Sequence, residues 1–159
     1  MEIKSLFKES YPKFSRYAYT LTKDYSSAED LVMDVFKKLI EREKSIPKDV
    51  NIEAYTMRSI KNQFYDMLKK EKTVNQFVVA TNEEQLADNS SSPQASENSN
   101  LDILIKNLET LGKNCKNALS LFGLGHSYKE IAEIEDISTG TVMSRMARCR
   151  EKLLVIYQE

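Results

Sequence analysis

The stretch that most limits the fold of this chain is residues 73–100, which divides it into two parts. It holds no lysine or arginine and four acidic residues, and most of it is rich in serine and asparagine. Within "ATNEEQLADNSSSPQASENSN" the only large apolar side chain is Leu86, so the segment buries too little surface to offset the entropy of ordering it. We therefore expect a flexible acidic linker between two small domains, residues 1–72 and residues 101–159.

Both flanking parts show the apolar spacing of amphipathic helices. Steps of three and four residues recur, which place apolar side chains on one helix face. The first part carries such positions at Phe7, Tyr11, Phe14, Ala18 and Leu21, then at Ala28, Leu31, Val32, Val35, Phe36, Leu39 and Ile40. Four glycines and three prolines in 159 residues disfavour a turn-rich β fold. The expected fold class is all-α, with two small helical domains.

Local signals predict where helices begin and break. Pro12 lies inside the first apolar stripe and should kink or restart that helix. Ser26 with Glu29 three residues later resembles a capping box at the start of the second helix. In the second domain, Gly112 should weaken or break the helix that starts near residue 101.

The two cysteines, Cys115 and Cys149, do not predict a metal site. With a single histidine in the chain, they cannot complete the usual four-ligand zinc site. The chain has no apolar run near the ~20 residues that cross a membrane and no signal-peptide core, so we expect a soluble, cytoplasmic protein. In a reducing cytosol a disulfide is not expected, so we predict that both cysteines are buried free thiols. No cofactor or metal is predicted.

Residues 127–152 have the pattern of a helix-turn-helix. "YKEIAEIE" predicts a short helix, "DIS" a tight turn, and Ser138 the N-cap of a last helix. The second helix of such a unit enters the DNA major groove. Its predicted outward residues are Thr139, Thr141, Ser144, Arg145 and Arg148. Their hydroxyl groups can bind DNA phosphates, and the arginine side chains can form hydrogen bonds with guanine. The alternative is a plain αα-hairpin with a solvated basic edge.

The stretch "RSIKNQFYDMLKK" (residues 58–70) predicts a helix with two unlike faces. The core face carries Met57, Ile60, Phe64, Met67 and Leu68. The other face gathers Arg58, Lys61 or Asn62, Tyr65, Lys69 and the following Lys72, although the chain as a whole has a net charge of −1. Lysine and arginine follow a phosphate backbone, and a tyrosine ring stacks on an unpaired base. This spacing alone leaves two alternatives open, a solvated face and a surface for single-stranded nucleic acid.

The sequence shows no convincing catalytic constellation. His126 lies in a predicted turn without a fixed partner, where a contact with phosphate or solvent is expected. The glycines of "GLG" at residues 123–125 follow no predicted strand, so they are weak evidence for a phosphate-binding loop. We therefore do not expect an enzyme.

Taken in order, three stretches resemble the bacterial RNA polymerase sigma factors of the sigma-70 family, in the small two-domain extracytoplasmic-function (ECF) group. "AEDLVMDVFKKL" (residues 28–39) resembles the polymerase-core-binding stretch, and "AYTMRSIKNQFYDMLKKEK" (54–72) the end of the first domain, with Asn62 and Asp66 matching. "SYKEIAEIEDISTGTVMSRMARCREKL" (127–153) resembles the C-terminal helix-turn-helix. The resemblance covers nearly all of the chain.

The resemblance, together with the outward helix faces described above, implies three sets of site residues. Polymerase core binding is implied for Asp30, Met33, Asp34 and Lys37. Contact with the single-stranded −10 element is implied for Arg58, Lys61, Asn62, Tyr65, Asp66 and Lys69. Contact with the −35 duplex is implied for Thr139, Thr141, Ser144, Arg145 and Arg148.

This chain also departs from the family's pattern. Met33 stands where glutamine is usual, Lys69 where arginine is usual and Gly112 where a proline is usual. Glu135 and Asp136 replace a typical Leu-Gly at the turn, and aspartate tolerates the left-handed backbone that a turn needs. Met143 replaces a common basic residue. These departures bear on promoter strength and base preference more than on function.

The resemblance implies a promoter-specificity subunit that binds core RNA polymerase, recognises the −35 and −10 promoter elements and promotes DNA opening. The implied partners are the β′ clamp and the β subunit of core polymerase, promoter DNA and an anti-sigma factor. The free chain is expected to be a monomer without membrane insertion. The alternatives are a stand-alone helix-turn-helix transcriptional regulator, which would be a dimer, and a helical adaptor whose basic faces are only solvated.

Overall fold

The structure is a computed structural model that describes residues 2–79 and 99–158, and their side chains except at residues 74–79, 99 and 101. The described residues form helices joined by turns and loops and contain no β-strand, which confirms the predicted all-α class. Most of the predicted linker, residues 80–98, lies outside the described residues. The first domain contains α1 (Ile3–Thr22), α2 (Tyr25–Glu41), the short 3₁₀ helix η1 (Glu43–Ser45) and α3 (Ile52–Val79). The second contains α4 (Ser99–Thr110), α5 (Lys113–Gly123), α6 (Tyr128–Glu135) and α7 (Thr139–Gln158).

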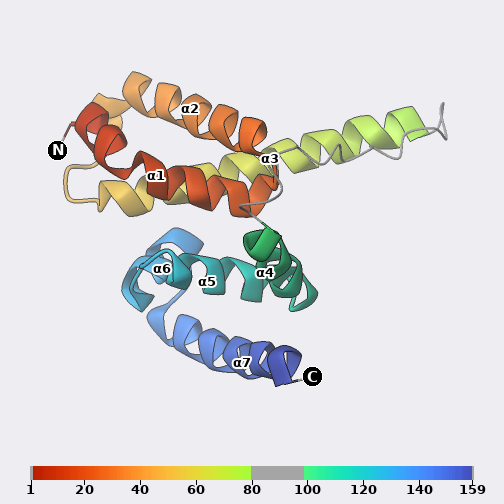
Figure 1. Cartoon of the computed structure of the whole chain (residues 1–159). Helices are drawn as coiled ribbons and strands as arrows, with labels where there is room; N and C mark the ends of the chain where they lie inside the picture. The colour runs from red at the N-terminus through yellow and green to blue at the C-terminus, as the bar shows by residue number, and fades with distance from the viewer. Residues whose placement is uncertain (1, 80–98, 159) are drawn as a thin grey trace.

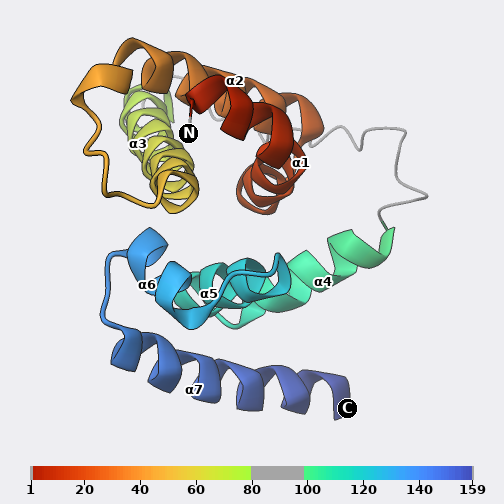
Figure 2. The ribbon, with the colours of Figure 1, turned by 90° about the vertical axis from the view of Figure 1, so that its left-hand side faces the viewer.

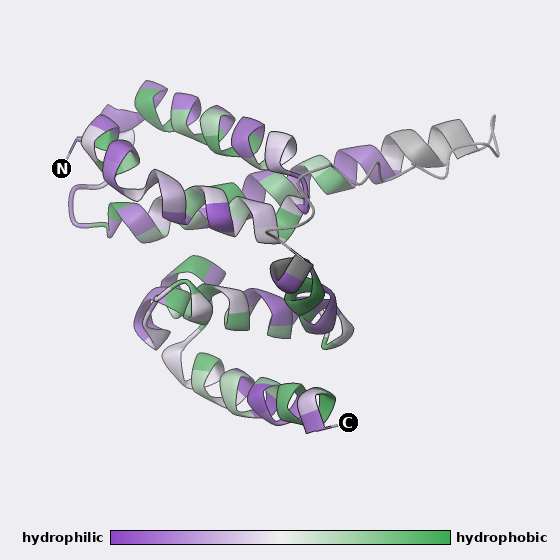
Figure 3. Ribbon diagram, viewed as in Figure 1, coloured by the Kyte–Doolittle hydropathy of each residue, from purple (hydrophilic) through white to green (hydrophobic). Residues whose placement is uncertain are grey.

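The first domain is a three-helix layer in which α1 and α2 pack on each other and on α3 (Figure 1). Each helix turns an apolar stripe inward and leaves polar residues outside, as the alternating colours of Figure 3 show. The centre of this core is fully buried and consists of Phe14, Tyr17, Leu31, Met57 and Ile60. Met67, which we predicted in the same core stripe, is instead 44% exposed, because it lines a groove between α2 and α3.

The helix start that we predicted at Ser26 is wrong. The side chain of Asp24 caps α2 by accepting the Ser27 backbone N–H at 2.9 Å, so the helix begins at Tyr25. The preceding Lys23 has a φ of 59°, and this left-handed residue ends α1 and reverses the chain. Pro12 lies within α1, which runs on through it as one helix rather than restarting.

The break predicted at Gly112 is confirmed. Helix α4 ends at Thr110, and Gly112 has a φ of 96°, in the region that favours glycine, before α5 begins at Lys113. The predicted turn between α6 and α7 also has its left-handed residue at Asp136, with a φ of 58°.

The prediction of two free buried thiols is wrong, because Cys115 in α5 and Cys149 in α7 form a disulfide. Both residues are buried, and their Cα atoms lie 5.4 Å apart, within the range that a disulfide spans. The redox state of a compartment does not show which cysteines lie close together in the fold. The packing of α5 on α7, which brings the two side chains together, is a tertiary property.

The two domains pack closely on each other. Helix α6 lies against α3, and α5 approaches α1, so that α3 separates α2 from the second domain while α7 forms the outermost layer (Figures 1 and 2). Buried apolar residues from Ile3 in α1 to Met146 in α7 form one continuous cluster. Helix α3 also runs to Val79, past the domain boundary predicted after residue 72.

Candidate nucleic-acid interface

The basic face of α3 is divided by the second domain. Arg58, Lys61 and Tyr65 are partly covered, because α6 packs along this side of the helix and two side chains of α5 contact Tyr65. Nη2 of Arg58 lies 3.0 Å from Oδ2 of Asp136, and Nζ of Lys61 lies 3.4 Å from Oε2 of Glu135. Three of the six predicted −10 residues thus have partners in the second domain.

Tyr65 has partners from two residues of α5. Its hydroxyl accepts a hydrogen bond from Nδ2 of Asn117 at 3.1 Å, and Nζ of Lys113 lies 3.7 Å from the ring centre. Burial raises the pKa of Tyr65; the bond from Asn117 acts against this, and the charge of Glu135 adds to it. The tyrosine is therefore a neutral hydrogen-bonding ring with a cation over one face.

The other predicted −10 residues, Asn62, Asp66 and Lys69, are exposed. Asn62 and Asp66 line the groove between α2 and α3, which has a volume of about 480 Å³. Asp34 of α2 lines the same groove and accepts a hydrogen bond from Nε2 of Gln63. Arg58, Lys61 and Tyr65 therefore lie at the domain interface and Asn62 and Asp66 lie beside α2, whereas Lys69 is exposed further along α3.

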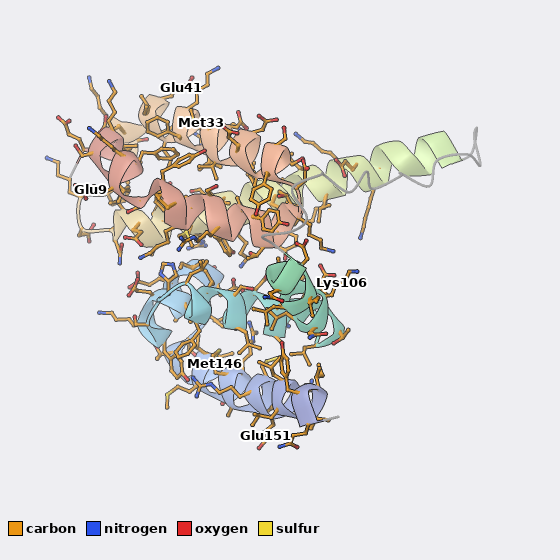
Figure 4. All side chains as sticks on the ribbon, in the orientation of Figure 1. Glu9, Met33, Glu41, Lys106, Met146 and Glu151 are labelled. Carbon is orange, nitrogen blue, oxygen red and sulfur yellow. A yellow bond between two sulfur atoms is a disulfide. The ribbon has the colours of Figure 1, made fainter. Side chains whose placement is uncertain are left out.

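The predicted core-binding residues share the outer side of α2. Asp30, Met33, Asp34 and Lys37 are all exposed, and Met33 is 48% exposed despite its apolar side chain. Figure 4 shows Met33 and Glu41 on α2, which lies on the side of the first domain away from the second domain. Asp34 is tied to its own domain by Gln63 and by Lys38, whose Nζ lies 3.4 Å from Oδ2 of Asp34. Asp30 and Met33 are the less constrained part of this face.

Helix α7 presents the predicted −35 residues at its N-terminal end. Oγ of Ser138 accepts the Thr141 N–H at 3.1 Å, which confirms the predicted N-cap. Thr139, Thr141, Ser144 and Arg148 are exposed, while Arg145 is half-buried. The opposite face, with Val142, Met146 and Cys149, is buried against the rest of the domain.

The hydroxyls at this end of α7 are partly used by the helix itself. The Ser138 and Thr141 hydroxyl oxygens are 2.8 Å apart, and the Ser144 hydroxyl donates to the Gly140 carbonyl at 3.2 Å. Nε of Arg148 donates to the Ser144 carbonyl at 3.4 Å, which holds the guanidinium close to the helix. These bonds order the side chains before any DNA is present.

Helix α6 has a capping box that was not predicted. Oγ of Ser127 accepts the Glu130 N–H at 3.1 Å, and the Glu130 carboxylate accepts the Ser127 N–H at 3.4 Å. The serine-to-glutamate spacing is the same as that of Ser26 and Glu29, so the signal was present in the sequence.

The expectation that His126 contacts phosphate or solvent is wrong. The residue is only 2% exposed, and its Nδ1 lies 3.1 Å from Oε2 of Glu130. Burial raises the pKa of Glu130, but the bonds with His126 and Ser127 outweigh it and lower the pKa overall. His126 thus belongs to the support of α6, because the capping glutamate reaches back over the turn.

Neither a metal centre nor a membrane span is found in the described parts of the chain. Residues 2–79 and 99–158 contain no group of three or more histidine, cysteine or acidic side chains arranged to hold a metal ion. None of their helices combines the length and apolar character needed to cross a bilayer.

Comparison with known proteins matches both domains. Residues 6–74 match the model of Sigma-70 region 2, and residues 101–153 match that of Sigma-70, region 4. The chain is 25% identical over 161 aligned positions to the ECF RNA polymerase sigma factor SigM of Bacillus subtilis (strain 168), covering 99% of this chain and 96% of SigM.

Solved structures of similar fold are found in complexes. The sigma factor RpoE, solved with the anti-sigma factor NepR from Bartonella quintana, matches with a TM-score of 0.76 and 26% identity, covering 98% of this chain and 96% of RpoE. CnrH, solved with the cytosolic domain of CnrY, matches in fold with a TM-score of 0.75 and 17% identity, covering 98% of this chain and 87% of CnrH. No comparison favours a stand-alone regulator. Two sigma domains in the family's order, on a fold shared over nearly the whole length, show that this chain belongs to the ECF group of the sigma-70 family and is a promoter-recognition sigma subunit.

Proposed function

We propose that this sigma subunit binds core RNA polymerase through the outer face of α2, holds the opened −10 element with α3 and reads the −35 duplex with α7. The domains would be residues 1–72 and 101–159, joined by the acidic segment 73–100. The observation that carries the proposal is that these three surfaces lie on three separate helices, each anchored by a buried apolar stripe. A promoter with separate −10 and −35 elements needs several such DNA-binding surfaces at fixed positions in one complex.

For the core-binding face, an exposed methionine next to two carboxylates is the supporting feature. Met33 offers apolar surface that no described element covers, and Asp30 and Asp34 suit a basic partner. Lys37 lies one turn further along the same face. The proposed partner is the β′ clamp of the polymerase, with the β subunit contacting other parts of the chain.

For the −10 element, we propose that Arg58, Lys61 and Lys69 contact phosphates, that Tyr65 stacks on an unpaired base and that Asn62 reads a base edge. Asp66 lies beside Asn62 on the same groove. The loop around Pro47, between η1 and α3, would receive a flipped base. Extruding a base costs a few kcal/mol, which stacking and phosphate contacts at this site would offset.

For the −35 element, we propose that Arg145 and Arg148 reach guanine edges from the N-terminal half of α7. The hydroxyls of Thr139, Thr141 and Ser144 would contact phosphates and fix the register of the helix. Support comes from the exposure of most of these residues on the side opposite the buried stripe.

The near-neutral charge of the chain supports action inside polymerase rather than alone. Phosphate contacts dominate the affinity of DNA-binding proteins, and a chain of net charge −1 has no positive excess with which to hold DNA by itself. We propose a cytoplasmic monomer that supplies recognition without catalysis or a cofactor. An anti-sigma partner is also proposed, since the similar RpoE was solved with one.

Run-off transcription with purified core polymerase tests the proposal. Added chain should yield initiation from some genomic promoters, and the absence of initiation from all of them would refute it. A core pull-down then tests α2. Asp30→Lys should weaken capture, while Glu9→Lys, the same charge change on α1, should not (Figure 4 shows Glu9). Asp30 is preferred to Asp34 because Asp34 also bonds Gln63.

A further inference from the structure

The second domain places two carboxylates on the basic face of α3. Glu135 is the last residue of α6, and Asp136 is the left-handed residue that follows it. The Lys61–Glu135 pair is the inner one, with side chains only 16% and 5% exposed. The Arg58–Asp136 pair is the outer one and more exposed, so it contributes less to the contact.

The local structure of α6 does not explain this acid pair. A carboxylate at the C-terminus of a helix is unfavourable, because the last carbonyl groups are already partly negative. The cations of α3 offset this cost. The turn also holds its backbone fixed, since the Asp136 N–H donates to the Ala132 carbonyl. At these two positions the sequence departs from the Leu-Gly of the pattern that it otherwise resembles.

Further contacts hold the domains in this arrangement. The Tyr65 hydroxyl accepts from the buried Asn117, the Tyr19 hydroxyl donates to Oδ1 of Asp102 at 2.7 Å, and Lys23 pairs with Glu109. Together they close the second domain over α1 and the covered part of α3.

The closed interface is nevertheless imperfect at its centre. Oε1 of Glu135 and the Tyr17 hydroxyl are buried, and neither has a hydrogen-bond partner among the described residues. Buried polar groups without partners cost free energy. Such an interface is less stable than a fully satisfied one, which suits a contact that must open.

We propose that Glu135 and Asp136 form an intramolecular competitor of single-stranded DNA. Their carboxylates pair with the cations of α3 that would otherwise bind phosphates. While the two domains are packed together, the chain therefore binds single-stranded DNA weakly, and binding strengthens when the domains separate. This inference rests on the proposed role of α3 in −10 binding. It goes further by assigning the turn of the helix-turn-helix a second, autoinhibitory task.

The test compares two variants of the full chain with the same change in net charge. Glu135→Gln with Asp136→Asn removes the charges of the turn at nearly constant shape. Glu133→Gln with Glu151→Gln removes two exposed carboxylates outside the contact. Small-angle X-ray scattering measures compaction, and the fluorescence anisotropy of a short labelled oligo-dT measures single-strand binding at low salt.

The turn variant should expand and bind oligo-dT about fivefold more tightly than the control variant, as expected when a minor binding-competent population becomes the major one. A charge exchange, Lys61→Glu with Glu135→Lys, should restore compaction relative to either single change, which also shows that the variants fold. Equal dimensions and equal affinity for the turn and control variants would overturn the inference.

The two proposals fail differently. If the turn variant expands but binds oligo-dT no better than the control, α3 is not inhibited by the turn, and the inference is wrong. Run-off transcription by the unmodified chain with core polymerase still tests the sigma function by itself. If that transcription fails while the turn variant expands and binds more tightly, the competition stands and the promoter role does not.

Discussion

The ammonium group of Lys113 lies 3.7 Å from the centre of the Tyr65 ring, so a cation of the second domain covers the ring that we propose stacks on a promoter base. One face of a ring cannot hold both partners. Base stacking on this face thus requires α5 to move away from α3, which links promoter opening to separation of the domains.

Replacing Tyr65 should therefore impair DNA opening more than recruitment to duplex. Tyr65→Ala removes stacking worth about 1–3 kcal/mol and should lower open-complex formation about fivefold or more. Tyr65→Phe keeps the ring and loses only the Asn117 bond, so it should remain close to the unmodified protein. Permanganate reactivity of −10 thymines reports opening, and a −35 footprint reports recruitment. Unchanged thymine reactivity in Tyr65→Ala would remove this residue from the mechanism.

The disulfide should stabilise the second domain. Cys115 and Cys149 are 34 positions apart in the sequence. A disulfide that closes a loop of this length restricts the unfolded chain and should raise the free energy of unfolding by about 2–4 kcal/mol. Dithiothreitol should lower the urea midpoint of the full chain. A variant with both cysteines changed to alanine should have a lower urea midpoint than the unmodified chain, and the reductant should not change that midpoint. Equal midpoints with and without reductant in the unmodified chain would contradict this expectation.

The capping box should make Ser127 more important for stability than Ser26. Ser127→Ala leaves the Glu130 N–H without its side-chain partner and should cost about 1 kcal/mol in the free energy of unfolding. Ser26→Ala is the matched control, because Asp24 rather than Ser26 caps α2. Urea denaturation measures both. A larger loss in Ser26→Ala than in Ser127→Ala would contradict the assignment of the caps.

The proposed −35 contacts predict a change in salt dependence. Arg148→Ala should weaken promoter binding by holoenzyme, and the plot of log affinity against log salt should become shallower by about one if the arginine contacts phosphate. If it contacts guanine, discrimination at one base pair should fall by about 1–3 kcal/mol instead. Lys106→Ala, an exposed charge on α4, is the control. Identical behaviour of the two variants would remove Arg148 from the interface.

Acidification should weaken the ion pair between Lys23, which follows α1, and Glu109 of α4. Burial raises the pKa of Glu109, but the nearby Lys23 and Lys116 outweigh it and hold the pKa below its ordinary value of 4.5. The ionised carboxylate therefore stabilises the folded chain above that value, and the contribution is lost as the pH falls below it. Urea denaturation of Glu109→Gln should show a smaller decrease in stability between pH 5 and pH 3 than the unmodified chain. Parallel pH profiles would contradict this role.

Much of the fold follows from the spacing of apolar residues, because a helix that must bury one face repeats it every three or four positions. Most of the stripe that predicted α2 is found buried, and Gly112 and Ser138 act where they were expected to act. The error at Ser26 has a local cause. Asp24, two residues earlier, also fits an N-cap, and the chain reverses at Lys23 just before it.

By itself, the sequence determined the helices, their inner faces and the chemical character of their outer faces, because these depend on residues a few positions apart. Only the tertiary structure decided which distant residues meet. It joined Cys115 to Cys149, buried His126 and placed Glu135 on Lys61, since each of these depends on how whole helices pack. The basic face of α3 was visible in the sequence, but its occupation by the second domain follows from the closure of one domain over the other.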